Sequence, residues 1–227
     1  MQLDTVVDDI YRELARLRHR FGDVALRDCT SRAPQPWPRR GVYLFFETGE
    51  VRTDGTARVV RVGTHAVGRG VGSTLWSRLR AHRGGRDGSG SHRASVFRRH
   101  VGAALIARDA VPPQLASDWA NKRASPDVRL AERKLEAQVS EHIGAMQVLW
   151  LDVDDAPGPT SERAYLEQNL IGALSTSPDA PSTTWLGRFT CVPEIVASGL
   201  WNIDYVGRVP EPDLLRRLRV AVERTIR

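Results

Sequence analysis

Apolar residues recur at helical spacing along much of the chain. Residues 3–21 carry an apolar stripe with acids early and arginines late, which is the charge order that the helix dipole favours. The same period predicts further helices at 73–83, 94–108, 128–144, 161–175 and 211–226. These helices separate shorter segments that follow a different pattern.

Three short segments are rich in β-branched and aromatic residues and predict strands. They are "GVYLFFE" (41–47), "ARVVRVG" (57–63) and "QVLWLDV" (147–153). Asp54-Gly55 is a hairpin signal between the first two. The order of elements predicts an α+β fold, in which a small three-stranded antiparallel sheet is flanked by helices. A helical insertion and N- and C-terminal helices complete it.

Four segments lack either period and are expected to connect the others. The stretch 31–40 contains three prolines, and 84–92 is rich in glycine and serine and is expected to be mobile. Residues 109–127 have no clear period, and 178–210 are irregular. With 227 residues, the chain is long enough for one well-filled core, so we expect a single domain over 1–227.

Composition excludes several classes of protein. A chain with 41% hydrophobic and 26% charged residues is not wholly disordered. Its apolar runs are too short to cross a bilayer, and no secretion signal is recognised at the first residues. Cys29 and Cys191 are too isolated for a disulfide framework or a zinc site. We therefore expect a cytoplasmic protein that has no membrane partner.

The positive charge is concentrated in one part of the chain. The net charge is +6, yet residues 58–108 contain eleven arginines and a single acid, Asp87. That segment alone carries +10, which leaves −4 for the rest. Lysine occurs only twice, so a compositional bias explains the preference for arginine over lysine, but it does not explain the missing acids. A local basic surface of this kind suits a polyanion such as DNA.

Arg78 and His82 lie four residues apart on the predicted helix 73–83 and share one face. An arginine clamps a phosphate with its planar fork, and a histidine exchanges a proton near neutral pH. The pair suits a scissile phosphate. By spacing alone, a solvated helix face in an arginine-rich chain explains the pair better.

Glu167 lies on the apolar stripe of the predicted helix 161–175. A carboxylate there loses hydration and needs a partner or a cation. Mg²⁺ takes oxygen ligands and often uses only one or two carboxylates, with water and phosphate completing its shell. A structural ion pair with an arginine is an equally good interpretation of Glu167 taken alone.

The glycine-rich loop 62–74 raises a third interpretation, which is nucleotide binding. It reads G-x-G-x-G rather than G-x-G-x-x-G and lacks the Gly-Lys-Ser/Thr of a P-loop. The glycines fit turn geometry, or a close approach of DNA backbone, better than they fit a nucleotide site.

Taken together, these motifs resemble the GIY-YIG nuclease superfamily. The segment "GVY" (41–43) is similar to the family's first motif and "RVG" (61–63) to its second. Arg78 and His82 are similar to the Arg-x-x-x-His of restriction-type members, and "EQNLI" (167–171) to the metal-binding glutamate motif. The resemblance implies a core formed by 41–83 plus 147–175, an insertion over 84–146 and a C-terminal extension over 176–227.

The resemblance implies a metal-dependent endonuclease that hydrolyses DNA, and it implies a role for each residue. Tyr43 orients or activates the attacking water, and Arg78 stabilises charge on the phosphorus. His82 hydrogen-bonds near Tyr43, and Glu167 holds one Mg²⁺ or Mn²⁺ on the phosphate. Phosphates of duplex DNA are expected on a basic set of residues, which is Arg80, Arg83, Arg86, His92, Arg93, Arg98 and Arg99.

Two departures from the family pattern leave alternatives open. Arg61 replaces the tyrosine of the second motif and is a poor general base, so Tyr43 or His65 would take that task. No asparagine follows the glutamate helix directly, and Asn169 and Asn202 lie at other positions. A catalytically impaired nucleic-acid-binding module on the same fold is the alternative function. Restriction, mobile-element and repair roles are not separated by these residues.

Overall fold

The computed structural model describes residues 3–32, 34, 36–67 and 72–227, and its centre is a three-stranded antiparallel sheet. The strands are β1 (Gly41–Val51), β2 (Ala57–Gly63) and β3 (Gln147–Asp152), in the order β2-β1-β3. In the middle strand, Tyr43 lies opposite Gly63 on one side and Trp150 on the other. The predicted α+β class and the three predicted strands are confirmed.

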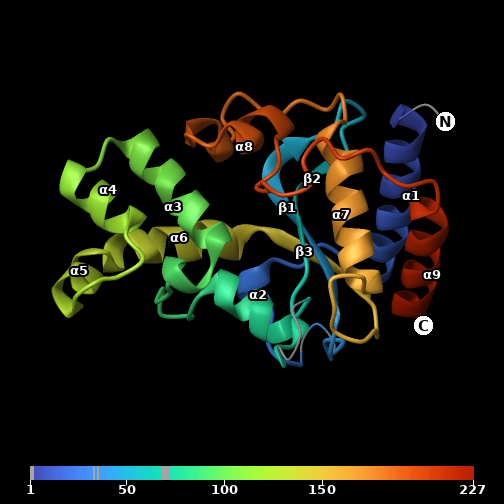
Figure 1. Cartoon of the computed structure of the whole chain (residues 1–227), viewed down its shortest axis with the longest axis horizontal. Helices are drawn as coiled ribbons and strands as arrows, with labels where there is room; N and C mark the ends of the chain where they lie inside the picture. Colours follow the sequence, from blue (N-terminus) through green and yellow to red (C-terminus); the bar gives the residue numbers. More distant parts are fainter. Residues whose placement is uncertain (1–2, 33, 35, 68–71) are drawn as a thin grey trace.

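Helices surround this sheet on both sides (Figure 1). Their bounds are α1 (Leu3–Phe21), α2 (Leu75–Arg83), α3 (Val96–Asp109), α4 (Pro113–Ala120), α5 (Pro126–Ala131), α6 (Arg133–Ala145), α7 (Glu162–Ser175), α8 (Pro193–Ser198) and α9 (Leu214–Ile226). Short 3₁₀ turns occur at Leu26–Asp28, His92–Ala94 and Leu186–Phe189.

Three sequence predictions of local structure need correction. The segment 109–127, expected to lack regular structure, contains α4 and the start of α5, and both have proline in the first turn, where it is tolerated. The single helix expected over 128–144 is divided near Glu132 into α5 and α6. The segment 178–210 contains α8, which ends at Gly199 with φ +67°. Helices of six to eight residues are too short to reveal a period.

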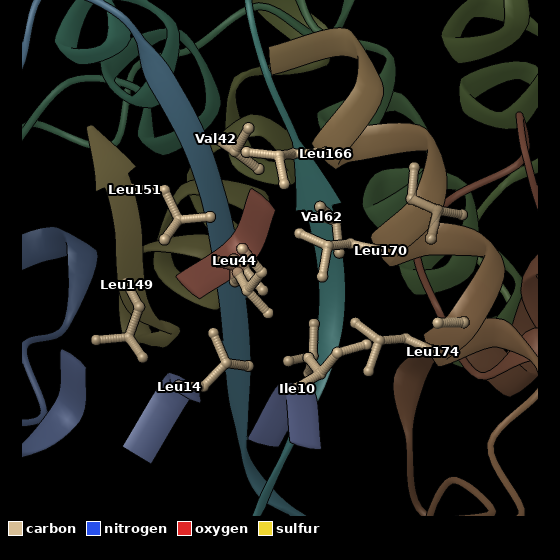
Figure 2. Close-up of a cluster of buried hydrophobic side chains, with 14 of the residues drawn as sticks. Ile10, Leu14, Val42, Leu44, Val62, Leu149, Leu151, Leu166, Leu170 and Leu174 are labelled. Atoms are coloured by element: carbon tan, nitrogen blue, oxygen red, sulfur yellow. The ribbon is translucent and has the colours of Figure 1, made fainter. Parts of the chain in front are cut away.

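One face of the sheet packs against α1, α7 and α9. Figure 2 shows this cluster, in which α1 supplies Ile10 and Leu14 and α7 supplies residues one turn apart. From β1, the alternate residues Val42 and Leu44 point into it because successive strand residues face opposite sides. The packing fixes α7, and with it Glu167, against the sheet.

The other face packs against α2, α3 and α6, which belong partly to the insertion. Tyr43 and Phe45, the residues of β1 between those of the first cluster, point to this side. There they meet Leu79 of α2 and Phe97 of α3 among fully buried side chains. The insertion is therefore packed directly onto the sheet face that carries Tyr43.

The free edge of β2 is covered by a segment of the C-terminal extension. The amide of Trp201 donates to the carbonyl of Val60 at 2.7 Å. The side-chain amide of Asn202 both accepts from the amide of Val62, at 3.1 Å, and donates to its carbonyl, at 2.9 Å. These bonds satisfy groups that an edge strand otherwise leaves unpaired.

The helices that the structure describes, which leave out positions 1–2, 33, 35 and 68–71, include none with the length and apolar character needed to span a membrane.

We expect Leu170→Ala to lower the free energy of unfolding by about 2–5 kcal/mol, since it leaves a cavity in the cluster beneath α7. Urea denaturation measures this change. Val209→Ala is the control, because Val209 is 79% exposed and its loss should change stability by no more than about 0.5 kcal/mol. Equal effects of the two substitutions would contradict the packing described for α7.

Candidate active site

Tyr43 and His82 meet between the sheet and α2. The hydroxyl oxygen of Tyr43 lies 2.7 Å from Nε2 of His82, and both side chains are fully buried. Gly63 lies directly beneath the tyrosine. A Cβ at this position would lie 2.2 Å from the hydroxyl oxygen of Tyr43, so no larger residue fits there. The glycine of the second motif is therefore needed for the tyrosine of the first motif to reach His82.

The local structure of α2 directs His82 inward. Thr74 and Ser77 form a reciprocal capping box at its start, and Leu75 and Leu79 anchor its buried stripe. His82 continues this stripe one turn later. Burial, together with the charges of Arg78, Arg61 and Arg98, lowers the pKa of His82 well below its ordinary value. The imidazole is therefore neutral at physiological pH.

The second ring nitrogen of His82 is also occupied. Nδ1 lies 2.8 Å from the hydroxyl oxygen of Ser95, the N-cap residue of α3. The guanidinium of Arg98 donates to the carbonyl of His82 at 3.0 Å. The insertion thus holds His82 by its ring and by its backbone.

Glu167 reaches the end of β2 from α7. Its Oε1 accepts a hydrogen bond from the amide of Thr64 at 3.0 Å, and the Thr64 hydroxyl donates to the carbonyl of Gly41 at 2.8 Å. Thr64 therefore ties the glutamate to both motif strands. Burial raises the pKa of Glu167, while Arg61 and Arg78 act in the opposite direction.

Arg61 and Arg78 both supply positive charge near Glu167. Arg61 lies 4.6 Å over the ring of Phe97 and donates to the carbonyl of Trp201. Arg78 is partly buried, and its Nε has no hydrogen-bond partner among the residues that the structure describes. Both arginines act electrostatically on Glu167 and on His82, so the structure gathers all four principal predicted residues around the end of β2.

His65 lies in the loop that follows β2. Its ring is buried, and burial next to Arg163 lowers its pKa to about 4. Its carbonyl accepts from Arg163 of α7, which also pairs with Asp155. Part of the glycine loop considered for nucleotide binding, residues 68–71, lies outside the described residues.

The side chains of the two candidate asparagines form hydrogen bonds with backbone groups. Asn202 bonds to Val62 at the edge of β2, as described above. Asn169 is buried, donates to the carbonyl of Tyr165 at 2.8 Å and accepts from the amide of Glu211 at 2.7 Å. Asn202 therefore lies next to the motif strands, whereas Asn169 joins α7 to the C-terminal extension.

The predicted DNA-binding set divides into two groups, and the prediction of exposed phosphate contacts is wrong for the first. Arg98 is fully buried against Glu136, and His92 is buried, bonded to the same carboxylate at 2.9 Å. Arg93 is held by Glu132 through two bonds of 2.6 and 2.8 Å. Arg83 is buried and donates to the carbonyl of Cys29 at 2.7 Å. These four side chains are used inside the protein.

The second group remains available to a ligand. Arg80 and Arg86 are exposed and Arg99 is partly exposed, and none of them forms an ion pair within the described part of the chain. The arginine-rich composition of this segment therefore has two origins: some residues stabilise the insertion, and others face solvent near α2.

The donor set at Glu167 fits a hard divalent cation held by few protein ligands. The residues that the structure describes contain no cluster of three or more His, Cys, Asp or Glu side chains of the kind that holds zinc. A partly buried carboxylate whose pKa is raised by burial gains from a neighbouring cation. Mg²⁺ or Mn²⁺ bound through this single carboxylate, water and substrate phosphate agrees with these donors.

Comparison with protein families gives a match over the whole chain, since the model of the GIY-YIG domain covers residues 1–227. The chain belongs to the GIY-YIG domain family. Curated proteins and solved structures gave no match. Membership of the GIY-YIG family implies nuclease activity in general, and GIY-YIG nucleases act on DNA.

Two residues of this GIY-YIG site were not found by sequence reasoning. Thr64 directly follows the second motif, and its place after the last strand residue is the signal that would have found it. Ser95 falls inside the helix predicted over 94–108, whereas the structure makes it the N-cap residue of α3. Nothing in the sequence indicated that its hydroxyl meets His82, which lies 13 residues earlier.

The buried histidines make stability dependent on pH. Burial lowers the pKa of His100 to about 4, so the unfolded chain binds a proton on acidification before the folded chain does. Stability is therefore lost as the pH falls from the ordinary histidine range toward 4. At pH 5, we expect His100 alone to cost about 2 kcal/mol relative to pH 7.

Urea denaturation at pH 7 and pH 5 measures this loss, which should shrink in the His100→Gln variant. His19→Gln is the matched control, since His19 is exposed on α1. An unchanged pH dependence in His100→Gln would show that this histidine is not the buried neutral group described here.

Proposed function

We propose that this GIY-YIG protein is a metal-dependent endonuclease that hydrolyses phosphodiester bonds in duplex DNA. The observation that carries the proposal is the meeting of Tyr43, His82, Arg78 and Glu167 at the end of β2. Phosphodiester hydrolysis needs an oriented water, a group that stabilises charge on the phosphorus and a cation on the phosphate. This set of side chains supplies all three.

Each residue has a task that follows from its surroundings. Tyr43, held by His82 at 2.7 Å, orients the attacking water with its hydroxyl. The Nε of Arg78 has no hydrogen-bond partner among the described residues, and its guanidinium is offered to the phosphate oxygens as negative charge develops. Glu167 would hold a Mg²⁺ or Mn²⁺ ion, which when bound polarises the phosphorus–oxygen bond.

Arg61 supports a second candidate, a binding module with impaired catalysis. A guanidinium stays protonated and does not act as a general base. In this protein it donates to the Trp201 carbonyl and lies over Phe97, so its task is to add positive charge beside the phosphate. We favour the nuclease because Tyr43 and His82 retain their hydrogen bond without a second tyrosine.

Arg80 and Arg86, which are exposed, and Arg99, which is partly exposed, form no ion pair within the described part of the chain and are the proposed contacts to the phosphates that flank the cut. Arg80 lies on α2, the helix that carries Arg78 and His82. A duplex placed over the site would therefore meet positive charge next to the scissile phosphate. We also propose a cytoplasmic setting, in which Cys29 and Cys191 remain free thiols.

We expect Glu167→Gln to reduce cleavage at least ~100-fold, because the neutral amide does not hold the cation on the phosphate. The measurement is nicking of supercoiled plasmid with Mg²⁺ or Mn²⁺ over time. Glu162→Gln, on the same helix but paired with Arg217 at 2.7 Å, is the control and should cut normally. Salt-dependent DNA binding without cutting by the unaltered protein would select the binding module instead.

Arg80→Ala and Arg86→Ala should each weaken DNA binding at low salt and reduce the slope of log K against log salt by about 1. Fluorescence anisotropy of a labelled duplex at several salt concentrations measures the slope. Arg216→Ala, on α9 and paired with Asp213, should leave the slope unchanged. If all three variants share one slope, Arg80 and Arg86 do not contact DNA phosphates.

A further inference from the structure

Ser95, His82 and Tyr43 form a buried chain of hydrogen-bonding groups. The Ser95 oxygen lies 2.8 Å from Nδ1 of the imidazole, and the Tyr43 oxygen lies 2.7 Å from Nε2. Ser95 is 1% exposed, and the other two are fully buried. Water therefore does not compete for the two contacts to the imidazole, and the hydrogens of the ring and of the two hydroxyls decide which group donates in each of them.

Two arrangements of the hydrogens are conceivable for a neutral imidazole. Two hydroxyls and one ring N–H offer three hydrogens to two contacts, so one hydroxyl hydrogen is left over. If Nδ1 carries the hydrogen, Tyr43 donates to His82 and the spare hydrogen belongs to Ser95. If Nε2 carries it, Ser95 donates to His82 and the spare hydrogen belongs to Tyr43.

The surroundings of Ser95 favour the second arrangement. Its oxygen already accepts from the amide of Arg98 at 3.2 Å as the N-cap of α3. Within the described residues, the Ser95 hydroxyl donates to no carbonyl or carboxylate, so a spare hydrogen there would be buried without a partner. A spare hydrogen on Tyr43 lies next to Gly63 at the end of β2, where the proposed function places the attacking water and the phosphate.

We propose that Ser95 is a positioning residue of the nuclease site: its hydroxyl donates to Nδ1 and holds His82 as the Nε2–H tautomer. The Tyr43 oxygen then accepts from His82 and directs its own hydrogen toward the bound water or phosphate. Arg98 supports this arrangement through its amide, on the Ser95 oxygen, and through its guanidinium, on the His82 carbonyl. This role rests on the proposed function, but the tautomer itself does not depend on cleavage.

The insertion therefore takes part in the site through its interior. Glu136 of α6 fixes Arg98 with one oxygen and the amide and ring of His92 with the other, at 2.7 and 2.9 Å. Ser95 lies between these two residues in the chain. The buried ion pair thus sets the place from which the serine hydroxyl reaches His82.

The first test is the tautomer of His82, read from the ¹⁵N chemical shifts of its ring nitrogens in protein labelled with ¹⁵N-histidine, without DNA or metal. The His82→Gln variant assigns the signals among the six histidines. We expect a protonated Nε2 and an unprotonated Nδ1. A protonated Nδ1 in the unaltered protein overturns the proposal whether or not the protein cuts DNA.

The second test removes the hydroxyl while keeping a residue that caps a helix. Ser95→Gly preserves most capping ability, since glycine is nearly as good as serine at the N-cap. We expect the two tautomers to mix and kcat to fall roughly tenfold or more at unchanged KM. Ser95→Thr should restore both the tautomer and kcat.

Ser125→Gly is the matched control, because Ser125 caps α5 in the same way, by accepting from the amide of Val128 at 3.3 Å. It should change neither the His82 shifts nor kcat. A Ser95→Gly protein that keeps the Nε2–H tautomer and full activity would overturn the role of Ser95. If no variant and no unaltered protein cuts DNA, the proposed function fails, while the ring shifts still decide the tautomer.

Discussion

The contact between Tyr43 and His82 is the constraint on which the arrangement of this molecule depends. It joins the middle strand of the sheet to α2 at 2.7 Å in a fully buried space. The contact requires a glycine beneath the tyrosine and an inward turn of α2. It also requires a further donor or acceptor for the second ring nitrogen, because a buried polar atom without a partner is costly. Each requirement draws another segment of the chain toward the end of β2.

The segment richest in arginine contains two kinds of arginine: some are bonded inside the protein and stabilise it, and others are exposed to solvent. Arg98 and Arg93 bind carboxylates within the insertion and Arg83 donates to the carbonyl of Cys29, whereas Arg80 and Arg86 face solvent. Breaking a buried pair such as Arg98–Glu136 leaves an uncompensated charge, so these residues are not interchangeable with the exposed ones. The local charge of the sequence therefore overstates the charge that is offered to a polyanion.

Sequence patterns predicted the sheet and the long helices, because these elements have a clear period. The family resemblance, not the period, pointed to the four candidate site residues, each of which lies on one of these elements. Val42 and Leu44 alternate with Tyr43 and Phe45, so the tyrosine was assigned to the strand that holds it. The patterns did not distinguish buried from exposed arginines. Arg98 contacts Ser95, three residues away, and Glu136, 38 residues away. Its side chain is buried because of the contact with the distant Glu136, which the local sequence pattern does not reveal. Contacts between distant segments leave no period in either one.

The side-chain amide of Asn202 bears on how much of the chain the folded sheet needs, because Asn202 lies outside the family motifs. By bonding to both the N–H and the C=O of Val62, one side chain does what a neighbouring strand would do at the sheet's border. A minimal version cut back to 41–83 and 147–175 would lose this cover and present a bare β-edge, which invites pairing with another copy. The segment that follows the motifs therefore occupies backbone groups of β2, and a shortened protein would leave those groups free to pair with a strand of another molecule.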